Sequence, residues 1–226
     1  MHESTQKLCC AAARGPELFP NTSRAKSSEE REAERASERL LIQRCKDGDP
    51  GAFDELITRF EKRVFNCAYH IAGNYDDASD ISQEAFIRAF NSIQTFRGDA
   101  NFTTWIYRIV TNVYLDERKK SKNHRHTSLD DYIELDENSV TRQIEDDGPT
   151  PDRIIEDKER DKIVHEAVNS LPDYQRIILT LYQFQNRSYE EIADILRLPI
   201  GTVKSRLNRA RLALTEKLRG KPELFG

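Results

Sequence analysis

Residues 188–214 carry the most restrictive pattern in the chain, because they specify two short helices and the turn between them. Ser188 and Glu191 have the spacing of a capping box, in which each side chain satisfies a free backbone N–H at a helix start. The sequence 198–201, with its proline and glycine, then predicts a turn, and we expect Thr202 to begin a second helix. Residues at spacings of four, three and four form the expected buried stripe of that helix: Val203, Leu207, Ala210 and Leu214.

The other faces of the second helix are polar and basic. Residues 197–221 contain eight basic residues and one acidic residue. A helix that buries one stripe and presents basic and amide side chains to base edges is typical of a helix-turn-helix. An ordinary solvated basic helix would explain the charge, but it would not explain the cap, the turn and the stripe together. We therefore predict that this segment binds duplex DNA.

The rest of the chain also shows helical periodicity. Apolar residues recur at helical spacing in four segments between residues 40 and 122, and again between residues 163 and 184. The expected buried stripes include Leu40 and Leu41 in the first helix and Ala89 and Phe90 in the third. Only 9 glycines and 8 prolines occur in 226 residues, which favours helices over a β fold with many turns. The predicted fold class is all-α, with two small helical domains.

Charge is distributed unevenly along the chain, and this divides it into parts. The net charge of −4 includes a segment, residues 127–161, with thirteen acidic and four basic residues. Such a composition buries little apolar surface and predicts a flexible acidic linker. We expect a disordered N-terminal extension over residues 1–35, with a helix start near Ser28, and the first domain over residues 36–126. The linker then covers residues 127–160 and the second domain residues 161–221.

Composition also excludes several classes of protein. No apolar run approaches the roughly 18 residues of a membrane span, and no signal-peptide core follows Met1. The four cysteines do not form the disulfide framework of a secreted protein in a chain of this length. We therefore expect a cytoplasmic protein without membrane insertion.

A second candidate for nucleic-acid binding lies in residues 96–122. Five aromatic residues are interleaved there with polar side chains: Phe96, Phe102, Trp105, Tyr107 and Tyr114. A basic run, residues 118–122, follows them, and residues 105–126 contain six basic and two acidic residues. Aromatic faces beside cations are what single-stranded DNA requires. Helical periodicity by itself, however, favours Trp105 as a core residue, so these residues alone leave both interpretations of the segment open.

Three motifs resemble the extracytoplasmic-function branch of the sigma-70 family. The first two are Asp80-Ile81-Ser82-Gln83-Glu84-Ala85-Phe86 continuing to Phe90, and Phe96-Arg97-Gly98-Asp99 continuing to Asn112. The third combines Leu171-Pro172 with residues 188–193 and 201–211. The resemblance implies a sigma region 2 domain of four helices and a sigma region 4 helix-turn-helix domain. It implies a protein that is not an enzyme, binds core RNA polymerase and directs promoter-specific transcription initiation. Such a factor recognises the −35 and −10 elements and nucleates DNA melting.

The resemblance also implies roles for individual residues. A surface that docks on the β′ clamp helices of the polymerase would contain Asp80, Gln83, Glu84, Phe86 and Arg88. The loop that captures a flipped −10 base would contain Gly98, Asp99, Ala100, Asn101 and Phe102. The adjacent −10 helix would contribute Trp105, Tyr107, Arg108, Asn112, Arg118, Lys119 and Lys120. The −35 element would be recognised by Thr202, Lys204, Ser205, Arg206, Asn208 and Arg209. The implied partners are promoter DNA, the β and β′ subunits of core RNA polymerase and an anti-sigma factor, and the acidic linker would enter the polymerase channels.

Two other classes of function compete with this interpretation. A stand-alone helix-turn-helix transcriptional regulator would need only the last segment, and it leaves residues 80–90 and the aromatic loop unexplained. A nucleic-acid-processing metalloenzyme would need converging ligands, whereas His124 and His126 have no acidic partner at ligand spacing and His70 and His165 lie on separate predicted helices. We therefore expect no metal, no cofactor and no catalytic residue.

Overall fold

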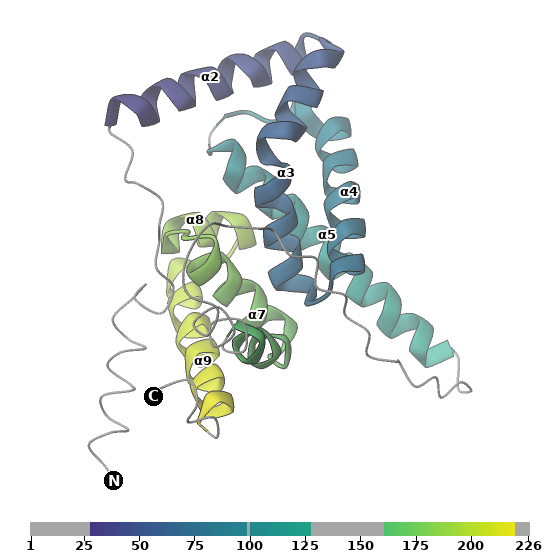
Figure 1. Cartoon of the computed structure of the whole chain (residues 1–226), viewed down its shortest axis with the longest axis vertical. Helices are drawn as coiled ribbons and strands as arrows, with labels where there is room; N and C mark the ends of the chain where they lie inside the picture. The colour runs from purple at the N-terminus through teal and green to yellow at the C-terminus, as the bar shows by residue number, and fades with distance from the viewer. Residues whose placement is uncertain (1–27, 99, 128–160, 220–226) are drawn as a thin grey trace, which may run out of the picture.

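The computed structural model describes residues 28–98, 100–127 and 161–219 (Figure 1). Asp99, the acidic linker and most of the N-terminal extension lie outside these ranges. Every regular element in the described ranges is helical, which confirms the predicted all-α class. None of the described helices is long and apolar enough to cross a membrane.

The first domain contains α2 (Ser28–Lys46), α3 (Pro50–Ala72), α4 (Tyr75–Ser92), the short 3₁₀ helix η1 (Ile93–Thr95) and α5 (Phe102–Thr127). Its helix ends follow local sequence signals. The Asp49 side chain accepts a hydrogen bond from the Gly51 N–H at the start of α3, where Pro50 is the first helical residue. Gly73 ends α3 in the left-handed region, with φ of 91°, and Asn74 caps α4 by accepting from the Asp77 N–H.

The core of the first domain is formed by the facing sides of α3, α4 and α5, with α2 packed against α3. Two residues that the apolar pattern assigned to buried stripes are exposed instead. Leu40 is 66% exposed and Phe90 is 57% exposed, whereas their neighbours Leu41 and Ala89 are buried. The reason is geometric, because adjacent helical residues point about 100° apart and a narrow contact buries only one of the two.

The second domain begins with a helical segment at residues 161–169, followed by α7 (Asp173–Leu179) and a π-helical turn, η2 (Thr180–Phe184). The helix-turn-helix consists of α8 (Tyr189–Leu196) and α9 (Ile200–Leu218). Both hydrogen bonds of the capping box between Ser188 and Glu191 are present, as predicted. Helix α9 begins two residues before Thr202, because the Pro199 carbonyl already accepts from the Thr202 and Val203 N–H groups, at 2.8 and 3.1 Å.

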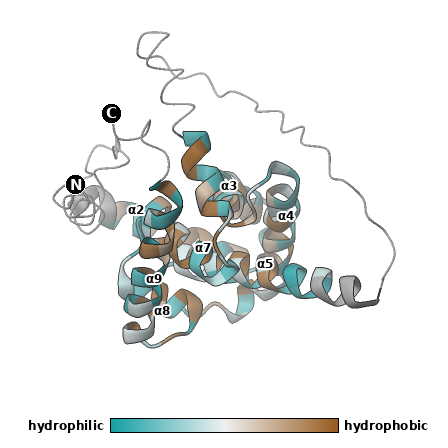
Figure 2. Cartoon of the chain, turned by 90° about the horizontal axis from the view of Figure 1, so that it is seen from below, coloured by the Kyte–Doolittle hydropathy of each residue, from teal (hydrophilic) through white to brown (hydrophobic). Residues whose placement is uncertain are grey.

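The two domains pack directly against each other (Figure 1). Helix α5 contacts α8, and α3 contacts η2 and α7. In Figure 2, hydrophobic and hydrophilic residues alternate along the helices, as expected when each helix buries only one of its sides. The arrangement places the predicted −10 helix, α5, beside the predicted −35 domain.

Candidate functional site

The exposed face of α9 brings together most of the residues predicted to contact the −35 element. Four of them share one exposed stripe along the helix: Lys204, Ser205, Asn208 and Arg209. The opposite face is buried through Val203, Leu207 and Ala210. A rigid helix therefore presents two cations, an amide and a hydroxyl in one direction, which is the donor and acceptor set used for base edges and phosphates.

Tyrosine rings lie behind several basic side chains of α9. The ammonium of Lys204 lies 5.7 Å from the ring centroid of Tyr189, and the Arg211 guanidinium lies 4.6 Å from that of Tyr182. The rings of Tyr182 and Tyr189 stack on each other at 5.4 Å. These cation–π contacts restrict the basic side chains before any DNA is bound.

Arg206 and Thr202, the other two predicted −35 residues, are half-buried. The Arg206 guanidinium lies 5.3 Å from the ring centroid of Tyr174 on α7. Arg206 therefore lies beside the exposed stripe of α9 and contacts a ring of its own chain, whereas Arg209 belongs to the exposed stripe.

The loop between η1 and α5 has buried ends, and exposed residues lie between them. Phe96 and Phe102 are buried, and both pack on the half-buried Trp105, with ring centroids 5.3 Å apart in each case. Gly98 is exposed with φ of 79°, a conformation that favours glycine, and Asn101 is also exposed. The rings of this segment therefore form part of the core, while Gly98 and Asn101 face outward. Binding of single-stranded DNA by this segment stays a prediction.

Helix α5 divides the predicted −10 residues into two groups. Asn112, Arg118, Lys119 and Lys120 are exposed. Tyr107, in contrast, is only 2% exposed, and its hydroxyl donates to Gln185 Oε1 of the second domain at 2.6 Å. The Arg108 guanidinium donates to the Asp194 carbonyl of α8 at 2.7 Å. The second domain thus covers Tyr107 and half-buries Arg108.

Tyr114, about two helical turns beyond Tyr107, is 3% exposed and also joins the two domains. Its hydroxyl donates to Asp173 Oδ1 at 2.7 Å, and the Arg176 guanidinium donates to the same hydroxyl. Burial, followed by the bond to Asp173, raises the pKa of Tyr114 to about 12. Burial likewise raises the pKa of Tyr107 well above its ordinary value. Both rings therefore remain neutral hydrogen-bonding groups at physiological pH.

Two histidines complete the contact between the domains. His165 stacks on Tyr69, with centroids 4.9 Å apart, and its Nε2 lies 3.0 Å from the Gly73 carbonyl. His70 stacks on Phe184 of η2 at 4.0 Å. Burial and the neighbouring His165 lower the pKa of His70 to about 4. No group of three or more His, Cys, Asp or Glu residues in the described ranges could hold a metal ion.

The outer face of α4 carries the residues predicted to bind polymerase. Asp80 and Gln83 are exposed, and Glu84 is half-exposed beside them. Two large apolar residues continue this stripe toward the end of the helix, Ile87 with 56% and Phe90 with 57% exposure. The spacing places Ile87 on this face. The apolar pattern assigned Phe90 to the core, but this residue is mostly exposed, and its ring meets the Phe53 ring in a T-shaped contact with centroids 4.9 Å apart.

Phe86 and Arg88, the remaining predicted polymerase-binding residues, are half-buried. Phe86 packs against the core. Arg88 links two helices, because its guanidinium donates to Glu84 Oε1 at 2.7 Å and to Asp116 Oδ2 of α5 at 2.8 Å. The side chains in these ion pairs are about one-third to one-half exposed, and ion pairs this exposed stabilise a protein only slightly. We therefore expect Arg88 mainly to orient α4 on α5.

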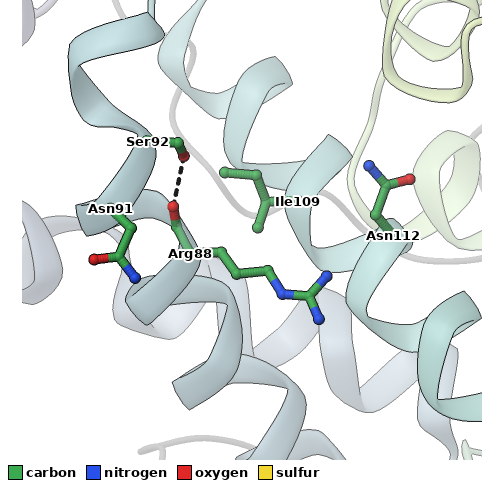
Figure 3. Close-up of a pocket in the computed structure, with 5 residues that line it drawn as sticks. All are labelled: Arg88, Asn91, Ser92, Ile109 and Asn112. Atoms are coloured by element: carbon green, nitrogen blue, oxygen red, sulfur yellow. Dashed lines mark hydrogen bonds between the residues drawn. The ribbon is translucent and has the colours of Figure 1, made fainter.

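A hollow of about 360 Å³ lies between α4 and α5, beside Arg88 (Figure 3). It is lined by Arg88, Asn91, Ser92, Ile109 and Asn112. The Ser92 hydroxyl donates to the Arg88 carbonyl at 2.5 Å. The hollow is open, and it lies between the end of α4 and Asn112 of the predicted −10 helix.

Comparison with known proteins identifies relatives of both domains. Residues 56–124 match the family model for sigma-70 region 2, and residues 161–214 match that for sigma-70 region 4. The chain is 35% identical to the ECF RNA polymerase sigma factor SigW of Bacillus subtilis over 179 residues, which cover 79% of this chain and 95% of SigW. It is 34% identical to the ECF RNA polymerase sigma-E factor of Escherichia coli K12, covering 82% of this chain and 96% of that protein.

Solved structures show the same fold. The sigma factor RpoE of Bartonella quintana, in its co-crystal structure with the anti-sigma factor NepR, matches with a TM-score of 0.59 and 25% identity, covering 75% of this chain and 98% of RpoE. CnrH in complex with the cytosolic domain of CnrY matches with a TM-score of 0.56 and 20% identity, over 82% of this chain and 99% of CnrH. The second match supports the fold alone.

Proposed function

The chain belongs to the extracytoplasmic-function branch of the sigma-70 family, and from this premise we propose which of its surfaces bind polymerase and which bind promoter DNA. It is a sigma factor, a non-enzymatic protein that directs core RNA polymerase to promoters for transcription initiation. The chemistry of nucleotide addition belongs to the polymerase.

The exposed stripe of α9 recognises the −35 element. Four polar side chains face outward from one helix whose opposite side is buried in the domain core: Lys204, Ser205, Asn208 and Arg209. This is the observation that carries the assignment, because a recognition helix must present several polar side chains to the major groove at once. Arg206 contributes less, since its guanidinium is held over Tyr174.

The outer face of α4 docks on the β′ clamp helices. Protein interfaces obtain most of their affinity from a few apolar or aromatic anchors surrounded by polar residues. Ile87 and Phe90 supply such anchors, and Asp80, Gln83 and Glu84 supply a polar, mostly acidic border. The predicted polymerase-binding surface is thereby extended by two apolar residues, Ile87 and Phe90.

The loop of residues 96–102 and helix α5 recognise and melt the −10 element. Asn101, Asn112 and the basic run 118–120 are accessible in the described arrangement. Tyr107 and Arg108 are covered by the second domain, so the two domains must separate before these side chains reach DNA. The boundary is suited to reversible opening, because among the described residues Arg108 Nε and Asn169 Oδ1 are buried without a hydrogen-bond partner.

The remaining assignments follow from the family. RNA polymerase and chromosomal DNA are in the bacterial cytoplasm, and we place this chain there. The sigma factor RpoE of Bartonella quintana was solved with the anti-sigma factor NepR bound, which supports an anti-sigma partner for this chain as well. Such a partner would cover the polymerase- and DNA-binding surfaces.

Run-off transcription with purified core polymerase and genomic fragments tests the proposed function. We expect specific transcripts only when the chain and core polymerase are both present. A stand-alone helix-turn-helix regulator would instead protect a palindromic operator without polymerase and yield no polymerase-dependent transcript, which would overturn the assignment.

A further inference from the structure

We propose that Glu38 and Lys46 of α2 are positioning residues that hold the two ends of the −10 loop, residues 96–102, at a fixed separation. This inference rests on the proposed function of that loop in −10 recognition. Neither residue belongs to a sequence motif, and both lie more than 45 positions before the residues that they contact.

The first end of the loop is held by Lys46. Its ammonium donates a hydrogen bond to the Phe96 carbonyl and lies 5.9 Å from the centroid of the Phe96 ring. A second contact runs in the opposite direction, because the Gln94 side-chain amide donates to the Lys46 carbonyl at 2.7 Å. The end of α2 and the start of the loop are therefore joined through both backbone and side chains.

The second end of the loop is held by Glu38. Its Oε1 accepts a hydrogen bond from the Phe102 N–H at 3.3 Å, across 64 residues of sequence. Phe102 is the first residue of α5, and N–H groups in the first turn of a helix have no partner within the helix. A carboxylate at this position also interacts favourably with the helix dipole. Glu38 thus supplies from a distance the contact that a local capping residue usually makes.

The surroundings of Glu38 fix it in place. The Arg59 guanidinium of α3 donates to the Ser37 hydroxyl at 3.2 Å and to the Glu34 carbonyl at 3.1 Å, which anchors α2 next to Glu38. Partial burial raises the pKa of Glu38, while the Phe102 N–H and nearby arginines, including Arg59, favour its ionised form. Because the half-buried carboxylate of Glu38 accepts a hydrogen bond from the Phe102 N–H, it forms a structural contact and is not a solvated surface charge.

The geometry of α2 explains why two contacts are enough. Glu38 and Lys46 are eight residues apart, which corresponds to about 12 Å along a rigid helix. The helix therefore acts as a spacer between the Phe96 and Phe102 ends, while Gly98 and Asn101 between them remain exposed. A loop that selects one base needs this kind of support, because small displacements of a binding residue reduce selectivity.

The test uses holoenzyme reconstituted from the full chain and core polymerase. The probe is fork-junction DNA built from a promoter identified by run-off transcription, with either the matched base or a mismatched base at the flipped −10 position. We measure the ratio of the two affinities for wild type and for Glu38→Ala, Glu38→Gln, Lys46→Met and Asn101→Ala. Arg39→Ala, an exposed α2 residue, is the matched control.

We expect Glu38→Ala and Lys46→Met to reduce the affinity ratio by about tenfold, as for loss of one charge-assisted hydrogen bond. Glu38→Gln keeps an oxygen acceptor and should retain most of the ratio, and Arg39→Ala should not change it. Core-polymerase affinity and −35 duplex affinity should be unaffected in every variant. Core-polymerase affinity would fall if the substitutions merely unfolded the first domain, because the proposed polymerase-binding surface lies on α4.

Two results would overturn the proposal, and they distinguish failure of the support by α2 from failure of the proposed loop function. Loss of selectivity in Asn101→Ala but not in Glu38→Ala or Lys46→Met would show that the loop binds the −10 strand without support from α2. Unchanged selectivity in all variants, Asn101→Ala included, would show that the loop does not select the base, and the proposed function of the loop would fail first.

Discussion

The hydroxyl of Tyr107 donates a hydrogen bond of 2.6 Å to Gln185, and this bond crosses the boundary between the two domains. Tyr107 belongs to the helix predicted to contact the −10 strand, and Gln185 lies just after the π-helical turn of the −35 domain. The bond therefore couples the two DNA-binding domains in the free chain. It also means that the accessibility of the −10 helix depends on how tightly the domains associate.

Gln185→Ala removes this bond while leaving the predicted DNA-binding residue Tyr107 intact. We expect the domains of the free chain to separate more readily, by about 1 kcal/mol or roughly fivefold in the closed-to-open ratio. Distances between dyes attached at exposed positions of the two domains measure this change, and Lys217→Ala is the control on the exposed end of α9. An unchanged distance distribution in Gln185→Ala would contradict a role for the bond in closure.

Acidification should also open the boundary through His70. Its pKa is lowered from 6.5 to about 4 because the closed arrangement buries it against Phe184 and near His165. The open or unfolded chain binds a proton more readily, so the contribution of His70 to closure is complete above pH 6.5. That contribution decreases by up to about 1.4 kcal/mol per pH unit between pH 6.5 and 4.

The same dye distances, recorded between pH 7.5 and 4.5, measure this effect. His70→Phe keeps an aromatic ring against Phe184 and removes the titrating group, so its closure should depend less on pH than that of the wild type. Equal pH dependence in the two proteins would assign the effect to other groups, such as carboxylates.

Arg209 and Arg206 allow a direct test of the α9 assignment. Arg209→Ala should weaken binding to a −35 duplex by about 1–3 kcal/mol, the range for loss of a base contact. Arg206→Ala should have a smaller effect, because that guanidinium lies over Tyr174 beside the exposed stripe. Holoenzyme affinity for duplexes with intact and altered −35 elements measures both. A larger loss for Arg206→Ala than for Arg209→Ala would require a different orientation of α9 on the DNA.

Ile87→Ala and Phe90→Ala should each weaken core-polymerase binding by about 1–2 kcal/mol, as expected for apolar anchors at an interface. Both side chains are more than half exposed, so the thermal stability of the free chain should change little. Leu40→Ala removes a similarly exposed apolar side chain from α2 and serves as the control. Titration of labelled core polymerase with each variant measures affinity, and wild-type affinity in Phe90→Ala would remove that residue from the interface.

Much of the fold follows from local signals in the sequence. The capping box at Ser188 and Glu191 forms as predicted because both partners lie within one helical turn. The buried stripe of α9 is also predictable, since helical periodicity alone decides which side of the helix Val203 and Leu207 share. The sequence by itself thus determined the helical class, the helix-turn-helix and the polar face of its second helix.

Other features depend on contacts between segments far apart in the chain. Periodicity does not distinguish Phe90 from its buried neighbour Ala89, because the packing orientation of α4 on α3 decides which of the two side chains is buried. The bond from Phe102 to Glu38 spans 64 residues and that from Tyr107 to Gln185 spans 78. Only the tertiary structure decided that α2 contacts both ends of the predicted −10 loop and that the second domain covers part of the predicted −10 helix, because both depend on which surfaces meet when the helices pack.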